Sequence, residues 1–241
     1  MWKLLFDLSD RLFAIVPVKK WRKFLRTDLL FDYRRKLNAL YAVCPDLKHK
    51  KMRLAKGGGS LVFIIGNNTF KVRKHNYETG KFERFYREKR ITDALRSVCT
   101  IEIPNIEFLE HDGITFYKTA RIDGKLLISI PAWKIKKYQK QISEQLAEFI
   151  YKKSLVLPSE IEDLRTKPVA RDCSWIHGDM CSNILVNPRN MKITGIIDWE
   201  WARYDNTYDE FIGLVRVRKK MQKIGLDKTV SIAYENILNK K

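Results

Sequence analysis

The residues best suited to chemistry lie close together in the last third of the chain. Asp179 falls in an expected tight loop, Asn183 follows four residues later, and Asp198 comes fifteen residues after that. A carboxylate can orient a hydroxyl group for attack, and the oxygens of an amide and of a second carboxylate are ligands for Mg²⁺ in phosphoryl-transfer sites. This set predicts phosphoryl transfer, with Asp179 orienting the hydroxyl and Asn183 and Asp198 holding the metal.

Two short apolar runs, residues 185–186 and 193–197, are expected to bring these side chains together. The segment between them, 187–190, has the composition of a turn, so the runs predict a short hairpin. Its two ends return to one place, which brings Asn183 near Asp198. Helical spacing of apolar residues predicts a helix over 138–155 and a basic helical tail over 208–241. Residues 156–172, with prolines and many charges, are expected to form a loop with a short helix.

The chain upstream of this region predicts a small mixed lobe. The segments 53–56, 61–65 and 69–74 are separated by glycine- or asparagine-rich turns, which indicates three strands, the last two joined in a hairpin. A charged amphipathic helix is expected over 81–98. Two further strands, 106–109 and 114–120, flank a His-Asp-Gly turn and predict a second hairpin.

Two motifs of the chain resemble those of a known family. The run HGDxxxNIL from His177 to Leu185, followed by IIDWE at 196–200, is similar to the catalytic and metal loops of the aminoglycoside phosphotransferase and choline kinase group of small-molecule kinases. The resemblance covers roughly residues 53 to 215. It implies an α+β, two-lobed protein kinase-like fold, with a small antiparallel-sheet N-lobe and a mainly helical C-lobe. The expected domains are a basic amphipathic helical extension (1–52), a nucleotide-binding N-lobe (53–119) and a catalytic, substrate-binding C-lobe (120–241).

The resemblance also implies roles for residues of the large lobe. Asp179 matches the family's catalytic aspartate, His177 the residue that braces its loop, and Asn183 and Asp198 the Mg²⁺ ligands. Asp209 resembles the structural aspartate that follows the metal loop.

The implied cofactors are ATP and Mg²⁺, and the small lobe supplies most of the nucleotide contacts. Lys71 matches the lysine that contacts the α and β phosphates, with Lys74 as a rival, and Glu88 matches its partner on the helix. The backbone of the segment that joins the lobes would bind adenine. The further residues assigned to nucleotide binding are Gly57, Gly58, Gly59 and Ser60 in the covering turn, and Ala120 and Ile122 in the joining segment.

The catalytic loop departs from the kinase pattern in one respect. The spacing from Asp179 to Asn183 is one residue shorter than in HRDLxxxN, so either the loop is tightened or another group such as Ser182 helps to hold the metal. The turn GGGS also differs from GxGxxG, which weakens the case for a turn that covers the phosphates tightly. Because of the shortened loop, a kinase-like module with degraded catalysis, which binds nucleotide or partners, stays an alternative to an active enzyme.

The formal net charge of +19 bears on the acceptor. It would repel a polycationic aminoglycoside and favours an anionic or membrane-held acceptor. The size and the basic tail also resemble bacterial kinases of lipopolysaccharide core sugars, while a choline- or aminoglycoside-type acceptor stays open. A nucleic-acid partner is disfavoured, because no RRM, zinc-finger or helix-turn-helix signature accompanies the charge.

More than half of the excess charge lies in a short N-terminal segment. Residues 1–56 hold 15 Lys and Arg against 5 Asp and Glu, with Trp and Phe interspersed. Such helices suit an anionic membrane surface, although they can equally pack on their own domain. The apolar runs are too short to span a bilayer, and the four cysteines form no CxxC pair. We expect a cytoplasmic protein with reduced thiols, peripheral on the inner face of the cytoplasmic membrane.

Overall fold

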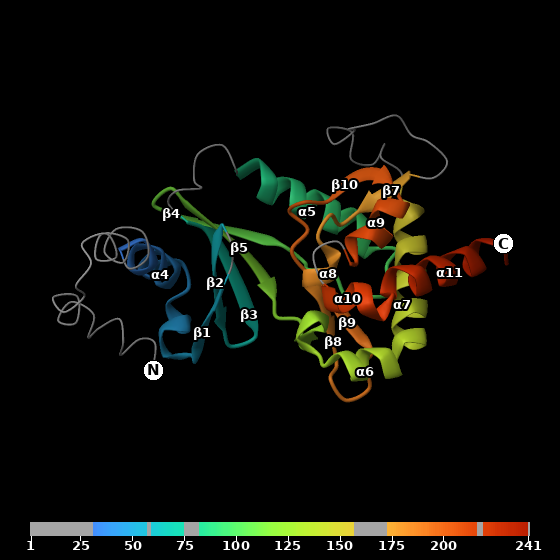
Figure 1. The fold of residues 1–241 in the computed structure, drawn as a ribbon. Helices are drawn as coiled ribbons and strands as arrows, with labels where there is room; N and C mark the ends of the chain where they lie inside the picture. Colours follow the sequence, from blue (N-terminus) through green and yellow to red (C-terminus); the bar gives the residue numbers. More distant parts are fainter. Residues whose placement is uncertain (1–30, 57–58, 75–81, 157–172, 216–218, 241) are drawn as a thin grey trace, which may run out of the picture. The chain divides into compact units, whose positions relative to one another are not determined.

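The computed structural model describes residues 31–56, 59–74, 82–156, 173–215 and 219–240 (Figure 1). It divides the chain into two compact units. The first holds residues up to 82 together with 107–121, and the second holds 83–106 together with 122–241. The second unit therefore takes in the helix that the sequence places between the first three strands and the last two strands of the first unit. The domain boundaries expected from the sequence stay predictions.

The first unit is built on a five-stranded antiparallel sheet of order β1-β2-β3-β5-β4. Both predicted hairpins are present, and each turns at residues with positive φ, Gly66 in one and Asp112 with Gly113 in the other. The left-handed conformation suits glycine and is tolerated by aspartate, which explains why these residues lie at the turns. The strands are β1 (Met52–Lys56), β2 (Ser60–Ile65), β3 (Asn68–Arg73), β4 (Glu107–His111) and β5 (Ile114–Ala120).

One helix of the basic N-terminal segment packs on this sheet. Helix α4 (Phe31–Val43), followed by the 3₁₀ turn η3 (Pro45–His49), buries Leu37 and Leu40 in one apolar cluster with strand residues such as Phe63. The ring centroids of Tyr33 and Phe63 lie 5.5 Å apart. For this helix the structure favours packing on its own domain. Residues 1–30, the rest of the expected membrane-binding segment, lie outside the described residues.

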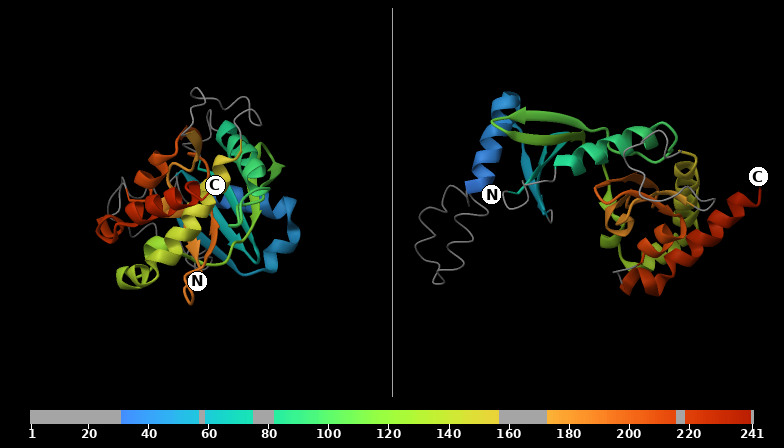
Figure 2. Two further views of the ribbon diagram at one scale, coloured as in Figure 1. Left: turned by 90° about the vertical axis from the view of Figure 1, so that its right-hand side faces the viewer. Right: turned by 90° about the horizontal axis from the view of Figure 1, so that it is seen from above.

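The second unit combines helices with two small sheets. Helix α11 packs against α7. Figure 2 gives two further views of the ribbon. The helices are α5 (Phe82–Arg96), α6 (Ala132–Lys137), α7 (Gln139–Ser154), α8 (Met180–Asn183), α9 (Tyr208–Gly213), α10 (Lys219–Ile224) and α11 (Leu226–Leu238), with the 3₁₀ turn η5 (Leu127–Ser129). The sheets are β6 (Lys125–Leu126), β8 (Ile184–Val186) and β9 (Ile193–Ile196) in order β6-β8-β9, and β7 (Cys173–Ile176) paired with β10 (Arg203–Asn206).

The long predicted elements are confirmed in this unit. The helices expected over 81–98 and 138–155 are α5 and α7, the short hairpin is β8 and β9, and the described part of the tail holds helices α9, α10 and α11. The sequence reading missed the β7–β10 pair. Within the described ranges, no helix is both long and apolar enough to cross a membrane.

Candidate active site

The loop between β7 and α8 carries Asp179, and its course depends on a glycine. Gly178 has a φ of +84°, and a Cβ atom placed there would lie 2.7 Å from the carbonyl oxygen of Trp201. Real Cβ atoms essentially never come so close to another heavy atom, and L side chains rarely adopt this backbone conformation. The tight turn expected around Asp179 is therefore present and is specified by this glycine.

The side chain of His177 supports this loop through hydrogen bonds of its ring. Its ring is fully buried, with Nε2 2.9 Å from the carbonyl oxygen of Ile197, while the backbone N–H of Asp179 donates to Nδ1 over 3.3 Å. One ring nitrogen thus donates and the other accepts, which is the pattern of a neutral imidazole. Burial lowers the pKa of His177, although the nearby Glu210 carboxylate opposes that shift. The neutral ring ties the backbone of Asp179 to the metal loop.

Asn183 and Asp198 are brought together by backbone hydrogen bonds. Helix α8 forms a single turn, so the Asn183 amide nitrogen reaches back and donates to the Asp179 carbonyl oxygen over 2.9 Å. The N–H of Ile197 donates to the carbonyl oxygen of Asn183 over 3.1 Å. The one-residue shortening of the loop is thereby accommodated as a helical turn.

Asp198 itself has a φ of +65°. Aspartate tolerates the left-handed region, and non-glycine residues in this conformation cluster at functional sites. The backbone of Asp198 is therefore compatible with a functional role for its side chain.

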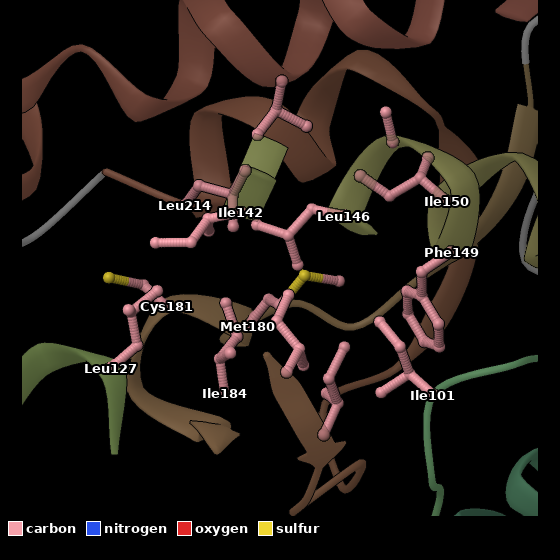
Figure 3. Packing of buried hydrophobic residues seen from close by; sticks show 14 of the residues in the cluster. Ile101, Leu127, Ile142, Leu146, Phe149, Ile150, Met180, Cys181, Ile184 and Leu214 are labelled. Carbon is pink, nitrogen blue, oxygen red and sulfur yellow. The ribbon is translucent and has the colours of Figure 1, made fainter. Parts of the chain in front are cut away.

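The core of the second unit anchors helix α8. Met180 and Cys181 are both buried, and Figure 3 shows their side chains among apolar residues of α7 and neighbouring segments. This packing fixes the turn that carries Asp179 at one end and Asn183 at the other. The labelled neighbours are Leu127, Ile142, Leu146, Ile184 and Leu214.

Glu88 of α5 holds the metal loop. It is fully buried, and its Oε1 accepts a hydrogen bond from the backbone N–H of Trp199 over 2.8 Å. The indole N–H of Trp199 in turn donates to the carbonyl oxygen of Ile196 over 2.9 Å. The residue after Asp198 is therefore fixed through both its backbone and its side chain.

A buried ion pair supports the catalytic loop from the opposite side. Glu210 of α9 accepts the backbone N–H of His177 over 2.7 Å, and its Oε2 lies 3.0 Å from Nζ of Lys153 on α7. Both charged side chains are at most 1% exposed. Burial lowers the pKa of Lys153, and the Glu210 carboxylate opposes that shift. Asp209, to which the sequence reading gave the structural role, is half exposed and lies 4.0 Å from Arg203 instead.

The residues assigned to phosphate and adenine contacts lie mostly in the first unit. Lys71 is in the middle of β3, 9% exposed, with Nζ 5.6 Å from the ring centroid of Tyr117. Gly59 precedes β2 and Ser60 begins it, whereas Gly57 and Gly58 lie outside the described residues. Ala120 ends β5, and the chain passes from the first unit to the second just before Ile122.

A family comparison agrees with this geometry. Residues 121–237, which include His177, Asp179, Asn183 and Asp198, match the model of the "phosphotransferase enzyme family". The matched segment, which is just under half of the chain, is similar to this family. This similarity agrees with the predicted enzyme class, a phosphotransferase with a hydroxyl group as acceptor. No curated protein matches the chain in sequence.

Solved structures agree on the fold. The GDP complex of aminoglycoside 2'-phosphotransferase-IIIa is 15% identical over 83% of this chain and 87% of that chain, with a TM-score of 0.61. Aminoglycoside phosphotransferase APH(3'')-Id from Streptomyces rimosus is 14% identical over 84% of this chain and 92% of that chain, with a TM-score of 0.58. Macrolide 2'-phosphotransferase MphH from Brachybacterium faecium is 12% identical over 84% of this chain and 83% of that chain, with a TM-score of 0.54. These likenesses confirm the predicted α+β, protein kinase-like fold.

The oxygen donors of this site fit Mg²⁺. Because the Asn183 amide nitrogen is used as a donor to Asp179, the amide oxygen is the atom left to meet a cation. Asp198 adds a carboxylate. Within the described ranges no three His, Cys, Asp or Glu side chains gather around a common point. Mg²⁺ is commonly held by one or two protein groups and completes its shell with phosphate oxygens and water, so two ligands suffice.

The supporting roles of Lys153 and Glu210 were not predicted from the sequence. Lys153 continues the spacing of the apolar residues Ile142, Leu146, Phe149 and Ile150 on α7, and a lysine on a buried helix face needs a charged partner. That periodicity could have identified it. Glu210 is adjacent to Asp209 in the sequence, and only the orientation of α9 decides which of the two carboxylates turns inward.

Proposed function

We propose that this enzyme transfers the γ-phosphoryl group of ATP to a hydroxyl group of a small-molecule or glycan acceptor, with Mg²⁺ as cofactor. The proposal rests chiefly on one observation, the convergence of Asp179, Asn183 and Asp198 on a loop that buried residues fix. Phosphoryl transfer needs positioning and charge stabilisation more than covalent chemistry. A rigid loop of this kind supplies the positioning.

Each side chain has a role in this proposal. Asp179 accepts the hydrogen bond of the acceptor hydroxyl and aims its oxygen at the phosphoryl group. His177 holds the Asp179 backbone, and Asn183 and Asp198 hold the cation. When bound, Mg²⁺ would neutralise charge on the phosphate oxygens.

The nucleotide contacts of the first unit stay part of the proposal. Lys71 would pair with the α and β phosphates, and Glu88 would keep its proposed partnership with that lysine. The turn from Gly57 to Ser60 would cover the phosphates, and the backbone of Ala120 and Ile122 would bind adenine. Among the structural relatives, one is described in a complex with streptomycin and ATP, and another is described in a complex with GDP. Both adenine and guanine nucleotides therefore belong in the tests.

The structure favours an active enzyme over a degraded module. The feature that suggested lost catalysis was the short spacing from Asp179 to Asn183. That spacing is accommodated by the single turn of α8, with the Asn183 amide bonded to Asp179 and its oxygen left for a cation. The shortened loop therefore gives no reason to expect loss of activity.

We propose an anionic or membrane-held glycan, such as a lipopolysaccharide core sugar, as the acceptor. Relatives of this fold are described in complexes with kanamycin and with streptomycin. A chain with a net charge of +19 would repel such cations and attract anions. Work on such an acceptor would place the enzyme at the inner face of the cytoplasmic membrane, in contact with anionic lipid.

An acceptor screen tests the proposal. The purified enzyme is incubated with Mg²⁺ and ATP or GTP, and with lipopolysaccharide core oligosaccharide, free sugars, choline, ethanolamine or kanamycin. Products are identified by the mass of one added phosphoryl group. We expect a phosphorylated glycan with ATP. Choline or kanamycin as the sole acceptor would refute the glycan, and nucleotide binding without transfer to any acceptor would refute catalysis.

A further inference from the structure

Three arginines gather beside the catalytic loop. Arg84 and Arg87 lie one turn apart on α5, and Arg203 begins β10. The guanidinium of Arg84 lies 4.5 Å from the ring centroid of Trp201, and Nη2 of Arg87 donates to the carbonyl oxygen of Ala202 over 2.7 Å. The consecutive residues 201–203 thus bring all three cations to one place, within a single unit of the chain.

This group of arginines adjoins Asp179. A Cβ atom built on Gly178, the residue before Asp179, would lie 3.3 Å from Nη1 of Arg203. The guanidinium of Arg203 is therefore packed directly against the catalytic loop. An anion held there would be next to the carboxylate that orients the acceptor hydroxyl.

Local carboxylates balance only part of this charge. Nε of Arg203 donates to Asp205 over 3.0 Å, and its Nη2 is 4.0 Å from Asp209. In the part of the chain that the structure describes, Nε of Arg87 is buried without a hydrogen-bond partner. Burial lowers the pKa of Arg87, and the charges of Arg84 and Arg203 lower it further. Gathering like charges costs free energy, which a bound anion would offset.

The surface beside these arginines suits a sugar ring. The side chain of Trp201 is 52% exposed although it is large and apolar. An aromatic face offers a flat surface to the C–H groups of a sugar, while guanidinium groups bind phosphate or carboxylate in a bidentate manner. The aromatic face and the guanidinium groups together suit an acceptor that carries both a sugar ring and a phosphate or carboxylate.

We propose that Arg84, Arg87 and Arg203 bind an anionic group of the acceptor, a phosphate or a carboxylate on a sugar, with Trp201 against the ring. This assignment of the acceptor rests on the proposed function. The anion site itself does not, because it can be measured without turnover. It places the acceptor's negative charge beside Asp179.

The test is direct binding to the full chain under saturating Mg²⁺ and ADP, which excludes simple occupation of the nucleotide site. Glucose 6-phosphate, glucuronate, inorganic phosphate and glucose are titrated by calorimetry. We expect both anionic sugars to bind more tightly than inorganic phosphate, and glucose to bind more weakly still. The double substitution Arg84→Gln/Arg203→Gln should weaken glucose 6-phosphate binding about tenfold or more, since a hydrogen bond to a charged group contributes roughly 1.5–3 kcal/mol.

Two matched variants control for charge and folding. Arg189→Gln removes one positive charge from the exposed β8–β9 turn and should leave binding unchanged. Arg84→Lys/Arg203→Lys keeps the positive charges but removes the planar guanidinium groups that can bind two oxygens at once, so it should bind glucose 6-phosphate with intermediate affinity. Failure of the wild-type protein to bind any anion, or equal binding by the double Gln variant, would overturn the site. Failure of phosphoryl transfer with anion binding intact would refute the proposed function and leave the site standing.

Discussion

At the scale of single residues, Gly178 decides where Asp179 points. Gly178→Ala should lower the free energy of unfolding by about 1–3 kcal/mol, because it combines a positive φ with a 2.7 Å approach to the Trp201 carbonyl. A denaturant titration measures this. Gly213→Ala is the matched control, because a Cβ atom there would meet nothing within 4 Å. Equal stability of the two variants would contradict the assigned role of Gly178.

His177 gives a prediction about pH. Its folded pKa is lowered by burial, whereas the unfolded pKa is near 6.5. As the pH falls below about 6.5, the unfolded chain binds a proton that the folded protein does not, so stability decreases with falling pH. Unfolding titrations from pH 7.5 to 5 should show this loss in the wild-type protein and a smaller loss in His177→Gln. His111→Gln serves as a control, since that side chain is 38% exposed. Identical slopes in His177→Gln and the wild type would exclude the buried neutral histidine.

At the scale of elements, helices α7 and α9 hold the catalytic loop through the pair of Lys153 and Glu210. Removing one charge leaves the other buried and unpaired, so Lys153→Met should cost about 3–5 kcal/mol of unfolding free energy. In Lys153→Met/Glu210→Gln the amide can still accept the N–H of His177. The double variant should therefore lose less than the sum of the single losses. Lys152→Met, at the adjacent position, is the control; additive losses would show that the two charges are not coupled.

Most elements of this fold are predictable because their signals are local. The periodicity of α7 and the turn residues of the β2–β3 and β4–β5 hairpins are present in short windows of sequence. The pairing of β7 with β10 is not, since Cys173–Ile176 and Arg203–Asn206 are far apart in the chain and each is only four residues long. The residues of the site also differ in how far they can be predicted from local sequence. The motif residues could be named from their spacing, whereas the choice of Glu210 over Asp209 depends on tertiary packing.

At the scale of the whole molecule, the charge of +19 predicts salt-dependent recognition. Screening shortens the range of the protein's field to about 10 Å at 0.1 M salt and about 3 Å at 1 M. The KM for an anionic sugar acceptor should therefore rise several-fold as NaCl is raised from 50 to 500 mM, while the KM for a neutral sugar acceptor stays nearly constant. Initial rates at saturating ATP measure both. A KM for the anionic acceptor that is independent of salt would contradict an electrostatic role of the basic surface.

The central claim is that Asp179 orients the acceptor hydroxyl, and Asp179→Asn tests it most directly. The substitution keeps the size of the side chain and removes the carboxylate. With the acceptor found in the screen, kcat should fall by about 10²- to 10⁴-fold, while the affinity for Mg²⁺–ATP and the unfolding free energy stay close to those of the wild type. Equal kcat values for the two proteins would contradict the account.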